Sequence, residues 1–234
     1  MATESVNTID IAVRERPIVS PGGGDPTTGP GKRGPREPEP FDDMDDNENA
    51  FRDKSKIITL FLLLVVLMTF GGLIGAYVVI ATNDVLEWQP FSLPIPVWIS
   101  TALIIASSVT YEFAKRGVIA SNTAATRRYM IATSALGGMF ISSQLMAWLV
   151  LVNRGFYLSG NPYSGFFYIL TAIHAVHVLG GIIALGTITL RTWNATADLD
   201  EYFYRKALAI SVGMYWHFMG LLWIALFLLL GFWK

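Results

Sequence analysis

The sequence predicts an all-α, polytopic membrane protein in which five transmembrane helices form a bundle. Of the 234 residues, 53% are hydrophobic and only 15% are charged, a composition typical of membrane proteins. Five apolar runs also reach the ~20 residues that a helix needs to cross a hydrocarbon core of about 30 Å. The net charge of −1 and the position of the bases at the ends of apolar runs argue against a nucleic-acid surface.

Residues 1–50 are predicted to form a disordered tail, and residues 51–234 the membrane domain. The tail is rich in charge and proline, and stretches such as residues 21–26, PGGGDP, bury too little apolar surface to offset the entropy of an ordered backbone. Its first 30 residues contain no apolar h-region, so a cleavable signal peptide is not expected.

The five spans follow the tail in order. They are predicted at residues 57–81, 94–114, 129–152, 165–190 and 207–233. Pro94 and Pro96 stand at the beginning of the second span, where a helix tolerates proline. Glu112 is the only charged residue inside these limits, and it lies in the last turn of that span. Ion pairing at the membrane boundary is the favoured interpretation for this carboxylate, with proton entry as the alternative.

The lysines and arginines predict the orientation of the bundle. Ten bases fall on one side: Arg52, Lys54, Lys56, Lys115, Arg116, Arg127, Arg128, Arg191, Arg205 and Lys206. Only Arg154 and Lys234 fall on the other. Because short cytoplasmic segments carry the excess of positive charge, we expect the N-terminus and tail inside the cell and the C-terminus outside.

The chain's three histidines are candidate ligands for a haem or a metal. His174 and His177 are three residues apart and share one face of their helix, and His177 and His217 fall at depths where they could approach each other. The chain has no cysteine, and no carboxylate lies nearby to complete a metal shell. Hydrogen bonds to Thr171, Gln144 or a partner subunit are therefore the favoured interpretation, and we expect no cofactor in this chain.

Small residues recur every four positions in four of the spans, as in Gly71 with Gly75 and Gly180 with Ala184. This spacing predicts close helix–helix packing. An independent transporter or channel is disfavoured, because the chain lacks both an inverted repeat and a charge near mid-depth. No nucleophile, phosphate-loop or metalloprotease motif appears, so the chain is not expected to be catalytic by itself.

Two segments resemble subunit III of the haem–copper respiratory oxidases. Tyr215-Trp216-His217-Phe218, followed by Trp223 and Phe227, is similar to the signature of that family's last helix. His174-Ala175-Val176-His177, with Gly180 and Gly181, is similar to its paired-histidine helix. Gln144 in the third span is a weaker match. The resemblance covers residues 57–233 and points to the shorter, five-helix bacterial form.

The resemblance implies an accessory subunit without a redox centre, in the multi-pass inner membrane of a bacterium. Such a subunit contacts catalytic subunit I, with subunit II in the same complex, and binds phospholipid in a cleft. Haems and copper would lie in the partner subunits. It would support assembly and sustained proton uptake in aerobic respiratory electron transport. Packing and lipid contacts are the expected roles of His174, His177, Tyr215, Trp216, His217, Phe218, Gln144, Glu112, Gly180 and Gly181.

Three positions depart from the family pattern. Val66, Ala147 and Gly220 stand where family members commonly carry acidic residues, so the resemblance implies no carboxylate role at these positions. The departures leave two alternatives open: the five-helix accessory protein of nitric oxide reductases, and subunit III of a quinol oxidase.

Overall fold

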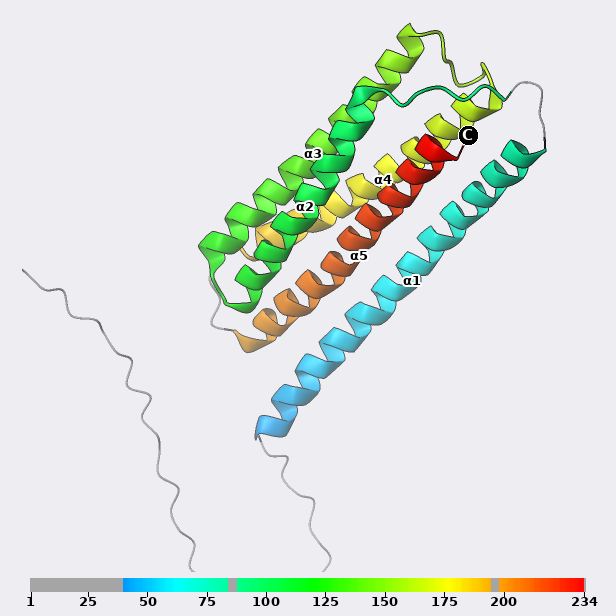
Figure 1. Cartoon of the computed structure of the whole chain (residues 1–234). Coiled ribbons are helices and arrows are strands. Elements are labelled where there is room, and N and C mark those ends of the chain that lie inside the picture. Colours follow the sequence, from blue (N-terminus) through cyan, green and yellow to red (C-terminus); the bar gives the residue numbers. More distant parts are fainter. Residues whose placement is uncertain (1–39, 84–87, 195–197, 234) are drawn as a thin grey trace, which may run out of the picture. The chain divides into compact units, whose positions relative to one another are not determined.

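Five long helices make up the regular structure of the chain in the computed structural model, which describes residues 40–83, 88–194 and 198–233, with side chains from residue 53 onward. The helices are α1 (Pro40–Thr82), α2 (Ile95–Ile119), α3 (Thr123–Asn153), α4 (Pro162–Arg191) and α5 (Leu199–Phe232) (Figure 1). All five are long and apolar enough to cross a membrane, and the described ranges contain no strand. The predicted all-α, five-span fold is confirmed.

The helices extend beyond the apolar runs, mainly at their charged ends. α1 begins at Pro40, so residues 40–50 are helical, although the sequence assigns them to a disordered tail; residues 1–39 lie outside the described residues. α5 begins at Leu199, before the apolar run. Helical hydrogen bonds need no hydrocarbon around them, so polar turns can continue a membrane helix.

Side chains at the helix starts explain where two of the helices begin. The Asn122 side chain accepts a hydrogen bond from the backbone N–H of Ala125, and the Asn161 side chain accepts one from that of Ser164. Each bond satisfies an amide that has no partner within the first turn of its helix. Proline at the first position of α4, Pro162, also favours a helix start.

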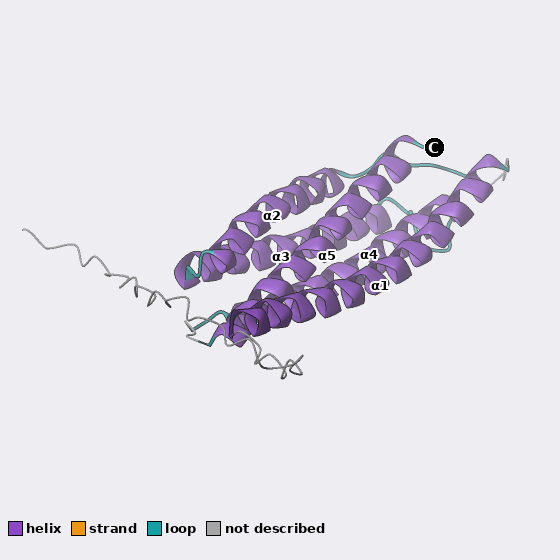
Figure 2. Ribbon diagram, turned by 90° about the horizontal axis from the view of Figure 1, so that it is seen from below, coloured by secondary structure: helices purple, strands orange, loops and turns teal. Residues whose placement is uncertain are grey.

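α5 is the central helix of the bundle. It packs against α1, α2 and α4, whereas α3 packs against α2 and α4, and α1 contacts only α5 and α4 among the described helices (Figures 1 and 2). Successive helices run in opposite directions. At one end the Tyr202 hydroxyl donates to the carbonyl of Ile119 (3.1 Å), and at the other the Tyr77 hydroxyl donates to that of Trp233 (2.7 Å).

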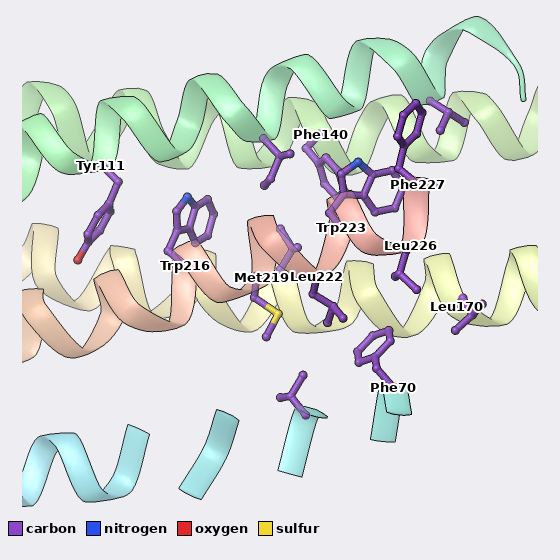
Figure 3. Close-up of a cluster of buried hydrophobic side chains, with 14 of the residues drawn as sticks. Phe70, Tyr111, Phe140, Leu170, Trp216, Met219, Leu222, Trp223, Leu226 and Phe227 are labelled. Atoms are coloured by element: carbon purple, nitrogen blue, oxygen red, sulfur yellow. The ribbon is translucent and has the colours of Figure 1, made fainter. Parts of the chain in front are cut away.

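Aromatic side chains fill the space between the helices. In Figure 3, Trp216 and Trp223 of α5 point toward α2 and α3, while Phe70 of α1 points toward α4 and α5. The rings of Phe140 and Trp223 meet edge to face, with centroids 4.9 Å apart. The same rings would also make dispersion contacts with acyl chains if they faced lipid. They stabilise the bundle only because they pack more closely against one another than against lipid.

The basic helix ends lie together at one end of the bundle. Arg191 of α4 and Arg205 of α5 both pair with Glu201, at 3.4 and 2.9 Å, and the Arg127 guanidinium lies 4.7 Å from the ring centroid of Trp193. This grouping agrees with the charge pattern on which the predicted orientation depends. The orientation itself stays a prediction.

Candidate functional site

His174 lies in the centre of the bundle and is fully buried. Its ring is surrounded by those of Phe70, Phe140 and Trp223, with centroids 6.2, 5.7 and 5.2 Å away. Neither ring nitrogen has a hydrogen-bond partner among the described residues. A polar ring without a hydrogen-bond partner in an apolar core costs free energy. The contacts that hold the His174 ring in place are therefore those with its aromatic neighbours.

Within the described part of the chain His174 bonds neither Thr171 nor Gln144 and His177 bonds its own helix, so that part of the prediction is wrong, while hydrogen bonds to a partner subunit stay a prediction. The Thr171 hydroxyl accepts from the indole N–H of Trp148 (3.1 Å) and donates to its own helix. The Gln144 amide nitrogen donates to the Ser100 hydroxyl (2.5 Å), which joins α3 to α2. The Gln144 carbonyl oxygen is buried and has no partner within the described part of the chain.

His177 and His217 face different helices rather than each other. Nδ1 of His177 donates to the carbonyl of Ile173 on its own helix (2.8 Å), and its ring meets that of Phe70 on α1. His217 lies against α2, with Nε2 3.9 Å from a carboxylate oxygen of Glu112. The expectation that these two histidines approach each other is therefore wrong. No group of three His, Cys, Asp or Glu side chains in the described ranges is placed to share a metal ion.

Glu112 forms an ion pair one turn along its helix, as predicted. Its carboxylate lies 2.6 Å from Lys115 Nζ and 3.8 Å from Arg116 Nε. The pair lies beside His217 in a groove of about 530 Å³ between α2 and α5, whose other walls are mostly apolar. A carboxylate with two adjacent bases is balanced in charge, which lowers the cost of holding it near hydrocarbon.

The four residues of the last-helix signature point in different directions. The Tyr215 hydroxyl donates to the backbone carbonyl of His177 on α4 (2.9 Å). The Trp216 indole N–H donates to the Ser107 hydroxyl on α2 (3.2 Å). His217 turns toward α2, and Phe218 packs against the apolar core. The hydrogen bonds of the signature thus connect α5 to α2 and α4, as a packing element would.

Gly181, not Gly180, is the glycine of close approach on α4. A Cβ added at Gly181 would lie 3.0 Å from ring atoms of Trp216, whereas one at Gly180 would meet only the Tyr215 hydroxyl, 4.0 Å away. Gly71 and Gly75 on α1 also face open space. The four-residue spacing therefore identifies some of the small residues on the chain, but it does not tell which of them lie at a helix crossing.

A row of hydroxyls on α2, in a segment that is a weaker match to the family pattern, receives polar side chains from α5 and α3, and the sequence does not predict these partners. Thr101 accepts a hydrogen bond from the indole N–H of Trp223 (3.0 Å), Ser107 accepts one from Trp216, and Thr110 shares one with Thr133 of α3 (3.0 Å). The spacing of Ser and Thr along residues 100–110 was the available signal. It shows a polar face but not the partners of that face.

A second groove of about 530 Å³ runs between α1, α4 and α5 at the basic end. Gly180 and Ala184 line it with small side chains that leave space, Leu62 and Leu208 add apolar walls, and Lys54 adds a base. A long apolar groove with a base at one end has the shape and polarity of a phospholipid site. We call it the α1–α4–α5 groove.

Comparison with known proteins identifies one family. The family model for cytochrome c oxidase subunit III matches residues 57–234. A probable cytochrome c oxidase subunit 3 of Nocardia farcinica is 32% identical over 176 residues, which is 72% of this chain and 83% of the relative. The cytochrome c oxidase subunit 3 of Corynebacterium diphtheriae is 30% identical over 184 residues (74% and 85%), and that of Thermostichus vulcanus 29% over 178 residues (74% and 84%).

Proposed function

Because the chain belongs to the cytochrome c oxidase subunit III family and is a subunit III of a haem–copper oxidase, we propose that it contributes packing and lipid contacts to that complex, and no redox centre. It is a multi-pass membrane protein of a multi-subunit complex. The comparisons do not favour the nitric oxide reductase or quinol oxidase alternatives, because the relatives described above are named as subunits of cytochrome c oxidase.

The observation that carries the proposal is the placement of the family's signature residues. Trp216 is buried, with 1% of its surface exposed, and His174 is fully buried, and both contact helices of this same chain. Residues that hold a bundle together in this way give the complex a rigid subunit surface. The partners we propose are the catalytic subunit I and subunit II, which carry the haems and copper.

The three departures from the family pattern support a role without carboxylates. Val66 and Ala147 are buried, with 2% and 0% exposure, and Gly220 lies against Ser108. Val66 and Ala147 are therefore packed apolar positions, and Gly220 adds no ionisable group to its own surroundings. We propose that the chain supports sustained proton uptake by stabilising the complex and its lipids, with phospholipid in the α1–α4–α5 groove, and that the complex lies in a bacterial inner membrane.

Affinity purification through a tag on this chain tests the proposal. We expect the tagged chain to bring down a haem-containing oxidase, and the chain separated from that oxidase to be colourless. In the intact complex, His177→Ala should leave the haem absorption spectrum unchanged, because His177 bonds its own helix. A Soret band that stays with the separated chain and disappears in His177→Ala would contradict the proposal.

A further inference from the structure

A separate cavity of about 150 Å³ lies at the basic end of the bundle, away from the signature residues. Four helix ends surround it: the last turn of α2, the first turn of α3, the residue after α4 and the first turns of α5. Its polar lining consists of Ser121, Thr123, Thr126, Thr192, Tyr202 and Arg205. We call it the hydroxyl cavity.

The chemistry of the lining favours an anion over a cation. It contains hydroxyls and one guanidinium, and no carboxylate lines it. Hard cations such as Ca²⁺ and Mg²⁺ require carboxylate or carbonyl oxygens, whereas hydroxyl and guanidinium groups donate hydrogen bonds to oxyanions. Thr192 and Tyr202 already donate to the carbonyls of Ile188 and Ile119. The remaining donors are Ser121, Thr123, Thr126 and Arg205.

Thr126 is the residue that most directly indicates a ligand. Its side chain is buried, with 1% exposure, and lines the cavity, and none of the hydrogen bonds between described residues includes its hydroxyl. Gly117 makes room for this hydroxyl, because a Cβ there would lie 2.8 Å from the Thr126 oxygen. A hydroxyl that faces a cavity inside the bundle needs a hydrogen-bond partner there, and a ligand in the cavity would supply it.

Arg205 supplies positive charge in a fixed position. Its side chain is 13% exposed, its Nε donates to Glu201 (2.9 Å), and its Nη1 donates to the carbonyl of Asn194 (2.9 Å). Among the described residues, Nη2 of Arg205 has no hydrogen-bond partner. The first backbone amides of α3 add to the positive potential, since the Asn122 cap accepts only from Ala125 and the N-terminus of a helix attracts anions.

We propose that the hydroxyl cavity binds a single tetrahedral oxyanion of the phosphate class, donated either by free inorganic phosphate or by a phospholipid headgroup. A volume of about 150 Å³ corresponds to roughly five water molecules, enough for one phosphate group and too little for a nucleotide. The bound anion would accept from Thr126 on α3 and from Arg205 on α5. It would thereby connect the α2–α3 pair to the end of the central helix.

The test uses the intact oxidase that contains this chain, delipidated in a maltoside detergent and held in phosphate-free buffer. Calorimetric titration with inorganic phosphate measures the affinity. We expect Thr126→Val to weaken it by about tenfold or more, because the variant keeps the shape of threonine and loses a hydrogen bond to a charged ligand. Thr126→Ser keeps the hydroxyl and should bind like wild type.

Thr187→Val is the matched control. The Thr187 hydroxyl is exposed and donates to the carbonyl of Ala184 on its own helix (2.7 Å), so its loss should leave phosphate affinity unchanged. If Thr126→Val fails to assemble, Arg205→Lys replaces it: this variant keeps the charge opposite Glu201 but loses the planar fork, and it should also bind phosphate more weakly.

Two results support the proposal and distinguish its two sources of phosphate. Binding of inorganic phosphate that depends on Thr126 identifies the free anion. A lipid phosphate that stays with wild type and Thr126→Ser through delipidation, and is lost from Thr126→Val, identifies a headgroup. If wild type binds neither, or if Thr126→Val and Arg205→Lys bind as wild type does, the cavity holds only water and the proposal is overturned.

Discussion

Trp216 connects three helices through one side chain. Its indole N–H bonds Ser107 on α2, and its ring lies against the positions of Gly137 on α3 and Gly181 on α4, where an added Cβ would approach to 2.9 and 3.0 Å. Only glycine leaves room for the ring at these two positions. The fit of a tryptophan against two glycines is therefore a specific determinant of how α3, α4 and α5 approach one another.

Neighbouring glycines on α4 test this arrangement. Gly181→Ala should destabilise the subunit by about 1–3 kcal/mol, because the new methyl group overlaps the Trp216 ring. Gly180→Ala, the matched control, should have little effect, since its methyl group meets only the Tyr215 hydroxyl. Thermal unfolding midpoints of the detergent-solubilised complex measure both. Equal midpoints for the two variants would show that Trp216 can move aside.

The sequence identified these residues but not their surroundings. It placed Gly180 and Gly181 together as packing candidates, and it placed His174 and His177 on one face. Only one member of each pair is fully enclosed: Gly181 lies under Trp216, and His174 lies among three aromatic rings. Adjacent residues point in directions about 100° apart around the helix, so only one of them faces a given neighbouring helix. The sequence alone does not show where that helix lies.

α1 is the least enclosed helix of the bundle. Only 11% of the residues in its apolar, membrane-spanning segment are buried, against 33–44% in the other four helices. Most of the surface of α1 therefore faces outward. It is held at one end by a hydrogen bond between Ser55 and Ser211 (2.6 Å) and at the other by the bond from Tyr77 to Trp233. The first bond is to α5, and the second is to the residue that follows it. These two bonds, with the buried side chains of Val66, Phe70 and Tyr77, attach the described part of α1 to the bundle.

Tyr77→Phe should loosen the C-terminal end of α1. The variant keeps the buried ring and loses the hydroxyl that bonds Trp233, a change of about 0.6 kcal/mol by the average for hydrogen bonds between membrane helices. The chain has no cysteine, so a cysteine introduced at Leu73 is a unique reporter on it. We expect a maleimide to label this cysteine two to three times faster in Tyr77→Phe.

Thr69→Val serves as the control for this measurement. The Thr69 hydroxyl is exposed and donates within α1, to the carbonyl of Val65 (2.9 Å), so its loss breaks no contact with α5. Labelling of Leu73→Cys should be unchanged in this variant. The same rise in both variants would mean that α1 responds to any polar change and is not held by Tyr77.

At the scale of the whole molecule, the basic residues give the bundle two unlike ends. Arg191, Glu201 and Arg205 form one ion-paired network at the end that also holds the hydroxyl cavity, and Tyr77 and Trp233 lie at the other. Charge of this kind resists transfer across the bilayer during insertion, which is why it predicts orientation.

Reporter fusions test that orientation. Fusions after residue 56, between residues 115 and 128, and near residue 198 should report the cytoplasm, because bases crowd these segments. Fusions near residues 88, 158 and 234 should report the external side. An alkaline phosphatase fusion, active only outside, and a fluorescent protein, active only inside, give opposite signals at each position. A cytoplasmic signal from the fusion at residue 234 would rule out the five-span topology.

The sequence by itself determined the number, order and type of the helices and the pairing of Glu112 with its own turn. These depend on the length of apolar runs and on residues three or four apart, which are local properties. The last-helix signature and the paired histidines carried the resemblance to the family, and recognising that resemblance needed no knowledge of how the two segments contact each other.

Only the tertiary structure decided which face of each helix is enclosed. It shows that His217 lies beside Glu112 and that Thr171 accepts a hydrogen bond from Trp148. It also shows that His174 is buried among aromatic rings, and that Thr126 and Arg205 line the same cavity. The physical reason is that lipid is as apolar as the interior of the bundle, so hydrophobicity does not distinguish an inward face from an outward one. Side-chain shape and hydrogen bonds between helices make that choice, and both depend on residues far apart in the sequence.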